Sequence, residues 1–166
     1  FLSLVDRTHT AGLKVIIDFV PNHVARNYFS DKEPQRPMLG QEDCPEWHFA
    51  QNNNFYYMVG QTFSSPEKGL DVEYVENPAK ASGNDAFTAT PSRNDWYETV
   101  KLNYGIDYRD GSCHFAPIPN TWYKMRDILL FWSSKGIDGF RVDMAEMVPV
   151  EFWRWVIGQI NMRYPH

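Results

Sequence analysis

The sequence predicts an α/β fold in which parallel strands alternate with helices and a long irregular segment interrupts the alternation. Two continuous apolar runs, residues 14–20 and 137–143, are typical of strands that helices cover on both faces. Helical periodicity flanks both runs. Between them, residues 24–120 show little periodicity and are rich in Asn, Asp, Gly and Pro. A structureless loop of that length would be unusual, so we expect a small inserted subdomain.

The first half of the alternation consists of one helix and one strand. We expect a helix over residues 1–11, which Gly12 is well suited to end because glycine readily adopts a left-handed conformation. Residues 14–20 then form the first strand, whose apolar run is interrupted only by Asp18. Inside the irregular segment, residues 55–59 and 96–102 are short runs that we expect to be strands.

The second half repeats the pattern after the insertion. A helix is expected to begin after a cap at Asn120 or Thr121 and to end at Gly136. Residues 137–143 form the second strand, and Pro149 is a good first residue for the last helix. The strands in such an order are parallel.

This alternation predicts part of a (β/α)8, or TIM, barrel. A complete barrel needs about 250 residues, and only two of its strands are identifiable, so we interpret the chain as a fragment of a larger catalytic domain. The expected organisation is a barrel segment at 1–23, an inserted subdomain at 24–120 and a second barrel segment at 121–166. Cut from their neighbours, the strands would have unpaired edges, so the fragment is expected either to have poor stability on its own or to self-associate.

Composition and charge argue against some classes of function. The net charge of −5 argues against nucleic-acid binding, which needs clustered Lys and Arg. No apolar run approaches the roughly 18–20 residues of a membrane-spanning helix. The compartment stays open, with secretion or the periplasm plausible for the parent protein.

Aromatic residues make up 16%, which suits sugar binding, although most rings are expected to pack in the core. Cys44 and Cys113 would pair only if the fold brings them together.

Charged residues near the carboxyl ends of the two strands are the strongest functional signal. Asp18 lies in the first strand, and Arg141 and Asp143 lie at the end of the second. Strand side chains alternate, so Arg141 and Asp143 point the same way. A guanidinium beside Asp143 would favour its ionised form, which a nucleophile requires. Two alternatives remain: a buried Asp–Arg pair that only closes a polar gap, and a metal-dependent hydrolase with Asp18 and His23 as ligands.

Three segments carry a resemblance to a known family. Asp18-Phe-Val-Pro-Asn-His23 and Gly139-Phe-Arg-Val-Asp143 resemble two signatures of the α-amylase family of glycoside hydrolases. Lys101-Leu-Asn103 resembles the short signature at the end of that family's inserted B domain. Their order and spacing fit the family's third barrel strand, its long insertion and its fourth strand.

The resemblance implies roles for five residues. Asp143 would be the nucleophile that forms a covalent glycosyl-enzyme, and Arg141 would position it. His23 would hydrogen-bond the sugar at the cleavage subsite, and Asp18 would brace Arg141. Asn22 would help to hold its loop, and in many members of the family it is a calcium ligand.

The implied activity is retaining hydrolysis of α-linked glucans such as starch and maltodextrins. It needs a second carboxyl group as acid/base, which the resemblance places on a glutamate beyond residue 166. We therefore expect residues 1–166 alone to be inactive. The alternatives are an α-glucan transglycosylase and a non-catalytic relative that serves as a binding subunit. The intact Asp143, Arg141 and His23 argue against the second.

Two departures from the family pattern concern calcium and the acceptor side of the cleft. Many α-amylases have Lys-His where this chain has Glu146 and Met147, and the usual aspartate before Leu-Asn is Lys101. Calcium is therefore a candidate cofactor and not an expected one. Tyr104 is a further candidate for sugar binding, as are Trp47, Tyr56 and Trp96, while His48 and His114 are more typical of solvated loops than of metal sites.

Overall fold

The chain forms two compact units in a computed structural model that describes residues 1–26, 30–67 and 74–165. Unit 1 comprises Phe1–Pro21 and Trp122–His166, and unit 2 comprises Asn22–Thr121. The insertion expected from the sequence, 24–120, begins two residues later than unit 2 and ends one residue earlier.

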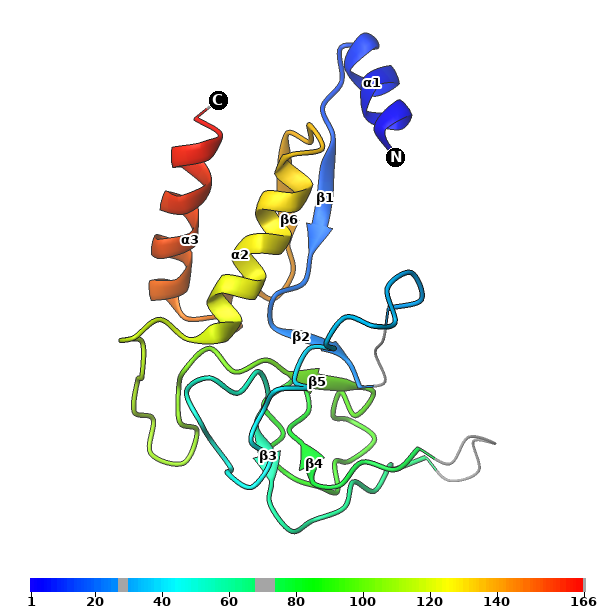
Figure 1. Ribbon diagram of the computed structural model, residues 1–166. Helices are drawn as coiled ribbons and strands as arrows, with labels where there is room; N and C mark the ends of the chain where they lie inside the picture. Colours follow the sequence, from blue (N-terminus) through cyan, green and yellow to red (C-terminus); the bar gives the residue numbers. More distant parts are fainter. Residues whose placement is uncertain (27–29, 68–73, 166) are drawn as a thin grey trace. The chain divides into compact units, whose positions relative to one another are not determined.

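Unit 1 contains the helices and a parallel pair of strands (Figure 1). Its elements, in chain order, are α1 (Leu2–Thr10), β1 (Ile16–Phe19), α2 (Asn120–Ser133), β6 (Gly139–Val142), the 3-10 helix η1 (Ala145–Met147) and α3 (Val150–Arg163). Strands β1 and β6 are parallel, with Ile16 opposite Gly139 and Asp18 opposite Arg141. Each element expected in this part of the chain is present, and the parallel pairing is confirmed. None of the described helices is long and apolar enough to cross a membrane.

Local sequence explains where the elements of unit 1 end. Gly12 follows α1 and Gly136 follows α2, both in the left-handed conformation (φ +74° and +80°) that ends helices at glycine. Asp138 then links the starts of the two strands: its Oδ2 accepts the Val15 backbone N–H at 2.7 Å and lies 2.9 Å from His9 Nε2. These two hydrogen bonds hold the pKa of Asp138 below its usual value.

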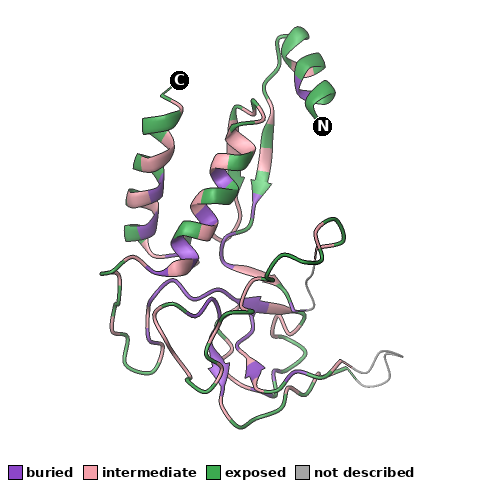
Figure 2. Ribbon diagram, in the orientation of Figure 1, coloured by how far each residue is buried: buried purple, intermediate pink, exposed green. Residues whose placement is uncertain are grey.

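The strands are more exposed than the sequence predicts. The expectation that both are buried on both faces is wrong for this structure: only Phe19 of β1 is buried, Ile16 is 63% exposed, and β6 has no buried residue (Figure 2). The barrel is not closed, since the sheet among the described residues of unit 1 has two strands. Burial in unit 1 is concentrated instead where α2 meets α3, as in the edge-to-face contact of Trp122 with Phe152.

Unit 2 is largely irregular and contains two short antiparallel pairs. Strand β2 (His23–Ala25) pairs with β5 (Thr99–Lys101), and β3 (Tyr57–Met58) pairs with β4 (Ala79–Lys80). The two runs expected to be strands contain β3 and β5, respectively. An apolar cluster supports this unit, made by the buried Tyr56, Met58, Ala79, Ala81 and Ala89 with the half-buried Phe49, Phe63, Phe87 and Tyr108 around them.

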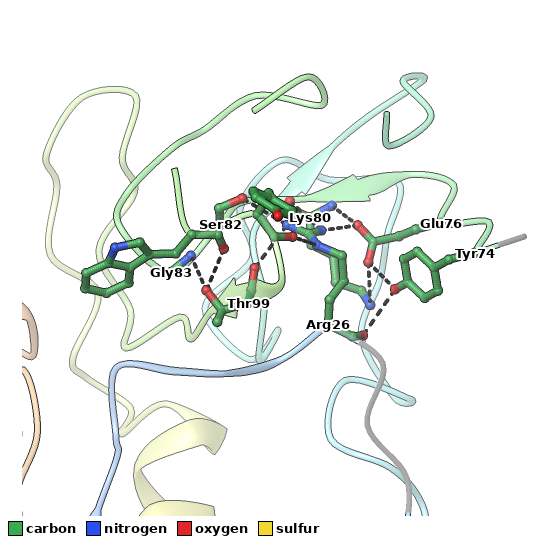
Figure 3. Close-up of polar contacts among 9 residues, drawn as sticks. Arg26, Tyr74, Glu76, Lys80, Ser82, Gly83 and Thr99 are labelled. Atoms are coloured by element: carbon green, nitrogen blue, oxygen red, sulfur yellow. Dashed lines mark hydrogen bonds and ion pairs between the residues drawn. The ribbon is translucent and has the colours of Figure 1, made fainter. Parts of the chain in front are cut away.

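A buried arginine joins the segments of unit 2 (Figure 3). Arg26 Nη1 lies 2.5 Å from Glu76 Oε1, and both side chains are 5% exposed. All five N–H donors of the guanidinium have acceptors: Glu76 Oε1, Ser82 Oγ and the backbone carbonyls of Lys80, Tyr97 and Thr99. Burial lowers the pKa of Arg26, and the Glu76 carboxylate offsets part of that shift. Glu76 also accepts the hydroxyl of Tyr74 at 2.7 Å.

The two cysteines do not pair. Cys44 and Cys113 are both free and exposed.

Candidate active site

A cluster of charged residues lies in unit 1, at the carboxyl ends of β1 and β6. Arg141 Nη1 is 2.9 Å from Asp143 Oδ1 and 3.3 Å from Asp18 Oδ2, so one guanidinium contacts two carboxylates. Asp143 follows the last residue of β6, and its backbone N–H donates to the carbonyl of Phe19 at 2.9 Å. The predicted alternation is confirmed, because Arg141 and Asp143 lie on the same side of the chain, close enough to pair.

Exposure separates this cluster from a structural ion pair. The side chains of Arg141 and Asp18 are 60% and 64% exposed, and that of Asp143 is 30% exposed. A buried pair that closes a polar gap does not fit these values. Exposed ion pairs contribute only about 0–1 kcal/mol to stability. An ion pair as exposed as this one adds little to the stability of unit 1.

The chain turns sharply directly after Asp143. Met144 has φ +51°, in the left-handed region that non-glycine residues seldom adopt, and η1 begins at the next residue. The indole N–H of Trp153 donates to the carbonyl of Ala145 at 3.0 Å and holds this turn against α3. Beside it lies a pocket of about 530 Å³, lined by Val142, Ala145, Glu146, Met147, Val148, Pro149, Val150 and Trp153. Strained backbone of this kind often accompanies a ligand site.

A separate group of candidate residues lies in unit 2 and is centred on Asn22, which is fully buried. Its Oδ1 accepts a hydrogen bond from Lys101 Nζ at 2.5 Å. Its Nδ2 donates to the Gly83 carbonyl at 2.7 Å and lies 3.2 Å from His23 Nδ1. The ammonium can only donate, so the oxygen and nitrogen of the amide are identified by their partners.

This hydrogen bonding selects one form of His23. The amide nitrogen of Asn22 can only donate, so Nδ1 of His23 accepts and the ring proton of the neutral imidazole lies on Nε2. The ring of Trp96 packs against the imidazole, with centroids 5.2 Å apart. In this tautomer, Nε2 of His23 is a hydrogen-bond donor. Its predicted contact with a sugar stays a prediction.

Because Gly83 has no side chain, its backbone can lie close to His23 and Thr99 while its carbonyl accepts the hydrogen bond from Asn22. A Cβ at Gly83 would lie 2.8 Å from His23 Cβ and 2.5 Å from Thr99 Oγ1. We expect Gly83→Ala to lower the free energy of unfolding by about 1–3 kcal/mol, because the added methyl group overpacks the turn. Denaturant unfolding of the variant beside the wild type measures this.

Gly158→Ala is the control for the Gly83 variant. Gly158 lies inside α3 with nothing within 4 Å of the added Cβ. That change is expected to stabilise the protein by up to about 1 kcal/mol through helix propensity. If Gly83→Ala were as stable as the wild type, the close packing of Gly83 against His23 would have no energetic consequence.

The remaining candidates are placed as follows. Tyr104 is only 2% exposed, and burial raises its pKa; its ring packs inside unit 2, and its role in sugar binding stays a prediction. Trp47 is exposed, whereas Tyr56 is buried in the apolar cluster. His48 contacts the Tyr57 carbonyl and His114 contacts Ser112. Among the described residues there is no group of three or more His, Cys, Asp or Glu that could hold a metal ion.

The sequence did not indicate that Gly83 and Asp85 contact the candidate residues of unit 2. It identified Lys101 only as a departure from the α-amylase family pattern. The pairing of Lys101 Nζ with Asp85 Oδ1 at 2.7 Å had no sequence signal, since any of the acidic residues of the insertion could have met that lysine.

Comparison with known proteins identifies the family. The "Alpha amylase, catalytic domain" family matches residues 1–155. The chain belongs to the α-amylase family. The resemblance inferred from its three motifs is thereby confirmed.

Several relatives of this α-amylase-family chain carry other names. An α-1,4-glucan:maltose-1-phosphate maltosyltransferase of Cereibacter sphaeroides is 27% identical over 99% of the chain and 19% of its own length. The protein of the same name from Picrophilus torridus is 41% identical over 80% of the chain and 14% of its own length. The human amino acid transporter heavy chain SLC3A1 is 27% identical over 89% of the chain and 18% of its own length.

A solved structure is also similar. The noncanonic maltogenic α-amylase AmyB from Thermotoga neapolitana has 21% identity and a TM-score of 0.43, over 96% of this chain and 25% of AmyB. The chain thus spans a quarter or less of each of these proteins.

Proposed function

We propose that the protein is a retaining enzyme that acts on α-linked glucans, with Asp143 as its nucleophile. The observation that supports this best is the contact of Arg141 with both Asp143 and Asp18 at the carboxyl ends of two parallel strands. Barrel enzymes place their reacting groups at this end of the strands.

The proposed reaction has two steps. A carboxylate oxygen of Asp143 attacks the anomeric carbon, the glycosidic C–O bond breaks, and the departing oxygen takes a proton from a second carboxyl group. Water or a sugar hydroxyl then attacks the same carbon, returns a proton to the second carboxylate and releases Asp143. Arg141 orients the Asp143 carboxylate through the 2.9 Å contact, and Asp18 holds Arg141 from its other side. The family resemblance assigns the second carboxyl to a glutamate beyond residue 166.

Unit 2 is proposed to be the inserted B domain of this enzyme and to supply part of the sugar-binding surface. His23, with its proton on Nε2, is proposed to donate a hydrogen bond to a sugar hydroxyl at the cleavage subsite. The hydrogen bond between Asn22 Nδ2 and His23 Nδ1 supports this, because it orients the imidazole, and a donor that is already oriented loses little entropy on binding.

Glycosyl transfer is the second candidate within the same chemistry. Relatives up to 41% identical are named as maltosyltransferases that use an α-1,4-glucan and maltose 1-phosphate. Transfer and hydrolysis share the glycosyl-enzyme and differ in whether a sugar or water attacks it. A binding subunit without catalysis is the third candidate, since a relative is named as an amino acid transporter heavy chain.

One experiment separates these candidates. The full-length protein is incubated with soluble starch, and separately with glycogen and maltose 1-phosphate, and products are followed by proton NMR from the first minutes. We expect α-anomeric products to appear first, with chain elongation from maltose 1-phosphate if transfer prevails. Early β-anomeric products would contradict a retaining mechanism, and binding of glucan without turnover would contradict an enzymatic role.

A further inference from the structure

Unit 2 holds a buried ammonium between two oxygen atoms from distant parts of the chain. Lys101, in β5, is 7% exposed, and its Nζ lies 2.5 Å from Asn22 Oδ1 and 2.7 Å from Asp85 Oδ1. Asn22 has no exposed surface. A buried ammonium is costly unless its partners compensate for lost hydration, so this lysine has a specific structural role.

Asp85 reaches Lys101 from a tight turn. The turn is closed by a bridge between Ser82 and Ala86 and by the Asp85 N–H, which donates to the Ser82 carbonyl at 3.1 Å. Asp85 itself has φ +63°, which aspartate tolerates better than most residues. Lys101 therefore joins three separate segments: the start of unit 2, this turn and β5.

The oxygen atoms around Lys101 Nζ are of the type that calcium prefers. An amide oxygen and a carboxylate oxygen are common Ca²⁺ ligands, and the family resemblance implies calcium at Asn22. The residues present do not fit that ion. A positive ammonium already lies 2.5 Å from the Asn22 oxygen, where it would repel a divalent cation and occupy its ligand.

We infer that the Lys101 ammonium takes the place of a structural calcium ion in unit 2. It holds the Asn22 oxygen, directs the amide nitrogen toward Gly83 and His23, and so fixes the acceptor role of His23 Nδ1. Lys101 is a positioning residue in this arrangement. This region of the protein then needs no calcium to keep its structure, and the inference is independent of the reaction that the protein catalyses.

The test restores the residue that is usual in the family. Lys101→Asp places a third oxygen group beside Asn22 and Asp85, so the variant is expected to bind one more calcium ion than the wild type, measured by isothermal titration calorimetry of the full-length proteins. Its Tm is expected to rise on addition of calcium by about 5 °C more than that of the wild type.

Two variants control for simpler explanations. Lys101→Met removes the ammonium without supplying an oxygen ligand and is expected to gain no calcium ion. Lys32→Asp makes the same charge change at an exposed lysine of unit 2 and is also expected to gain none, which excludes general electrostatic attraction. Equal calcium stoichiometry and equal Tm shifts in the wild type and Lys101→Asp would overturn the inference.

A second measurement keeps the inference testable if Lys101→Asp does not fold. Asp85→Asn changes an exposed turn residue in the wild-type background. The calcium stoichiometry is expected to be the same with and without this change, because the wild type has no calcium ion at Asp85. Loss of one bound calcium ion in Asp85→Asn would show that the metal, and not the ammonium, occupies this position.

Discussion

Asp143→Asn is expected to lower kcat on soluble starch by about 10⁴-fold or more, as removal of a nucleophile does in other enzymes with covalent intermediates. The amide has nearly the shape of the carboxylate, and its oxygen can still accept from Arg141, which lies 2.9 Å from the native Oδ1. It lacks the charge and nucleophilicity needed to attack an anomeric carbon. The loss should therefore appear in kcat, while the Tm stays close to that of the wild type.

The measurement is steady-state kinetics of the full-length protein, with glycosyl transfer from maltose 1-phosphate as a second assay. Glu151→Gln is the matched control, because it neutralises an exposed carboxylate on α3 that does not line the pocket. Its kcat is expected to change by less than about threefold. Full activity in Asp143→Asn would move the nucleophile to another residue. A large loss in Glu151→Gln as well would indicate that activity responds to the loss of any negative charge in this part of unit 1.

The second large effect is expected for stability, at the buried arginine of unit 2. Arg26→Met should lower the free energy of unfolding by about 3–5 kcal/mol, because it removes the nearer of two cations from the buried Glu76 carboxylate and leaves only Lys80 Nζ, at 3.4 Å. The change also removes donors from the carbonyls of Tyr97 and Thr99. Methionine keeps a similar length and apolar volume, so the loss reports mainly the charge and the hydrogen bonds.

Chemical denaturation of the wild type and two further variants measures this effect. The double variant Arg26→Met with Glu76→Leu should be more stable than Arg26→Met alone, since it removes a buried carboxylate that has lost its nearer cation. Arg36→Met is the control: Arg36 pairs with Glu33 at the surface, where its side chain is 74% exposed, and the expected loss is below about 1 kcal/mol. Equal losses in Arg26→Met and Arg36→Met would mean that burial adds nothing to the Arg26–Glu76 pair.

Much of unit 1 is predictable from the sequence because its signals are local. The helix ends follow from Gly12 and Gly136, whose left-handed conformations the structure shows. The common orientation of Arg141 and Asp143 follows from the two-residue period of a strand, and their ion pair confirms it. The burial of the strands was predicted wrongly, because burial depends on which other elements cover a strand and not on its own composition.

The family, the order of helices and strands, and the pairing of Arg141 with Asp143 thus follow from local signals in the sequence. The partners of the buried cations depend on tertiary packing. Arg26 meets Glu76 across 50 residues, and Lys101 meets Asn22 across 79. Contacts at such separations leave no periodic pattern in the sequence. These contacts form only when packing of the whole unit compensates for the conformational entropy that the chain loses and for the hydration removed from each charge.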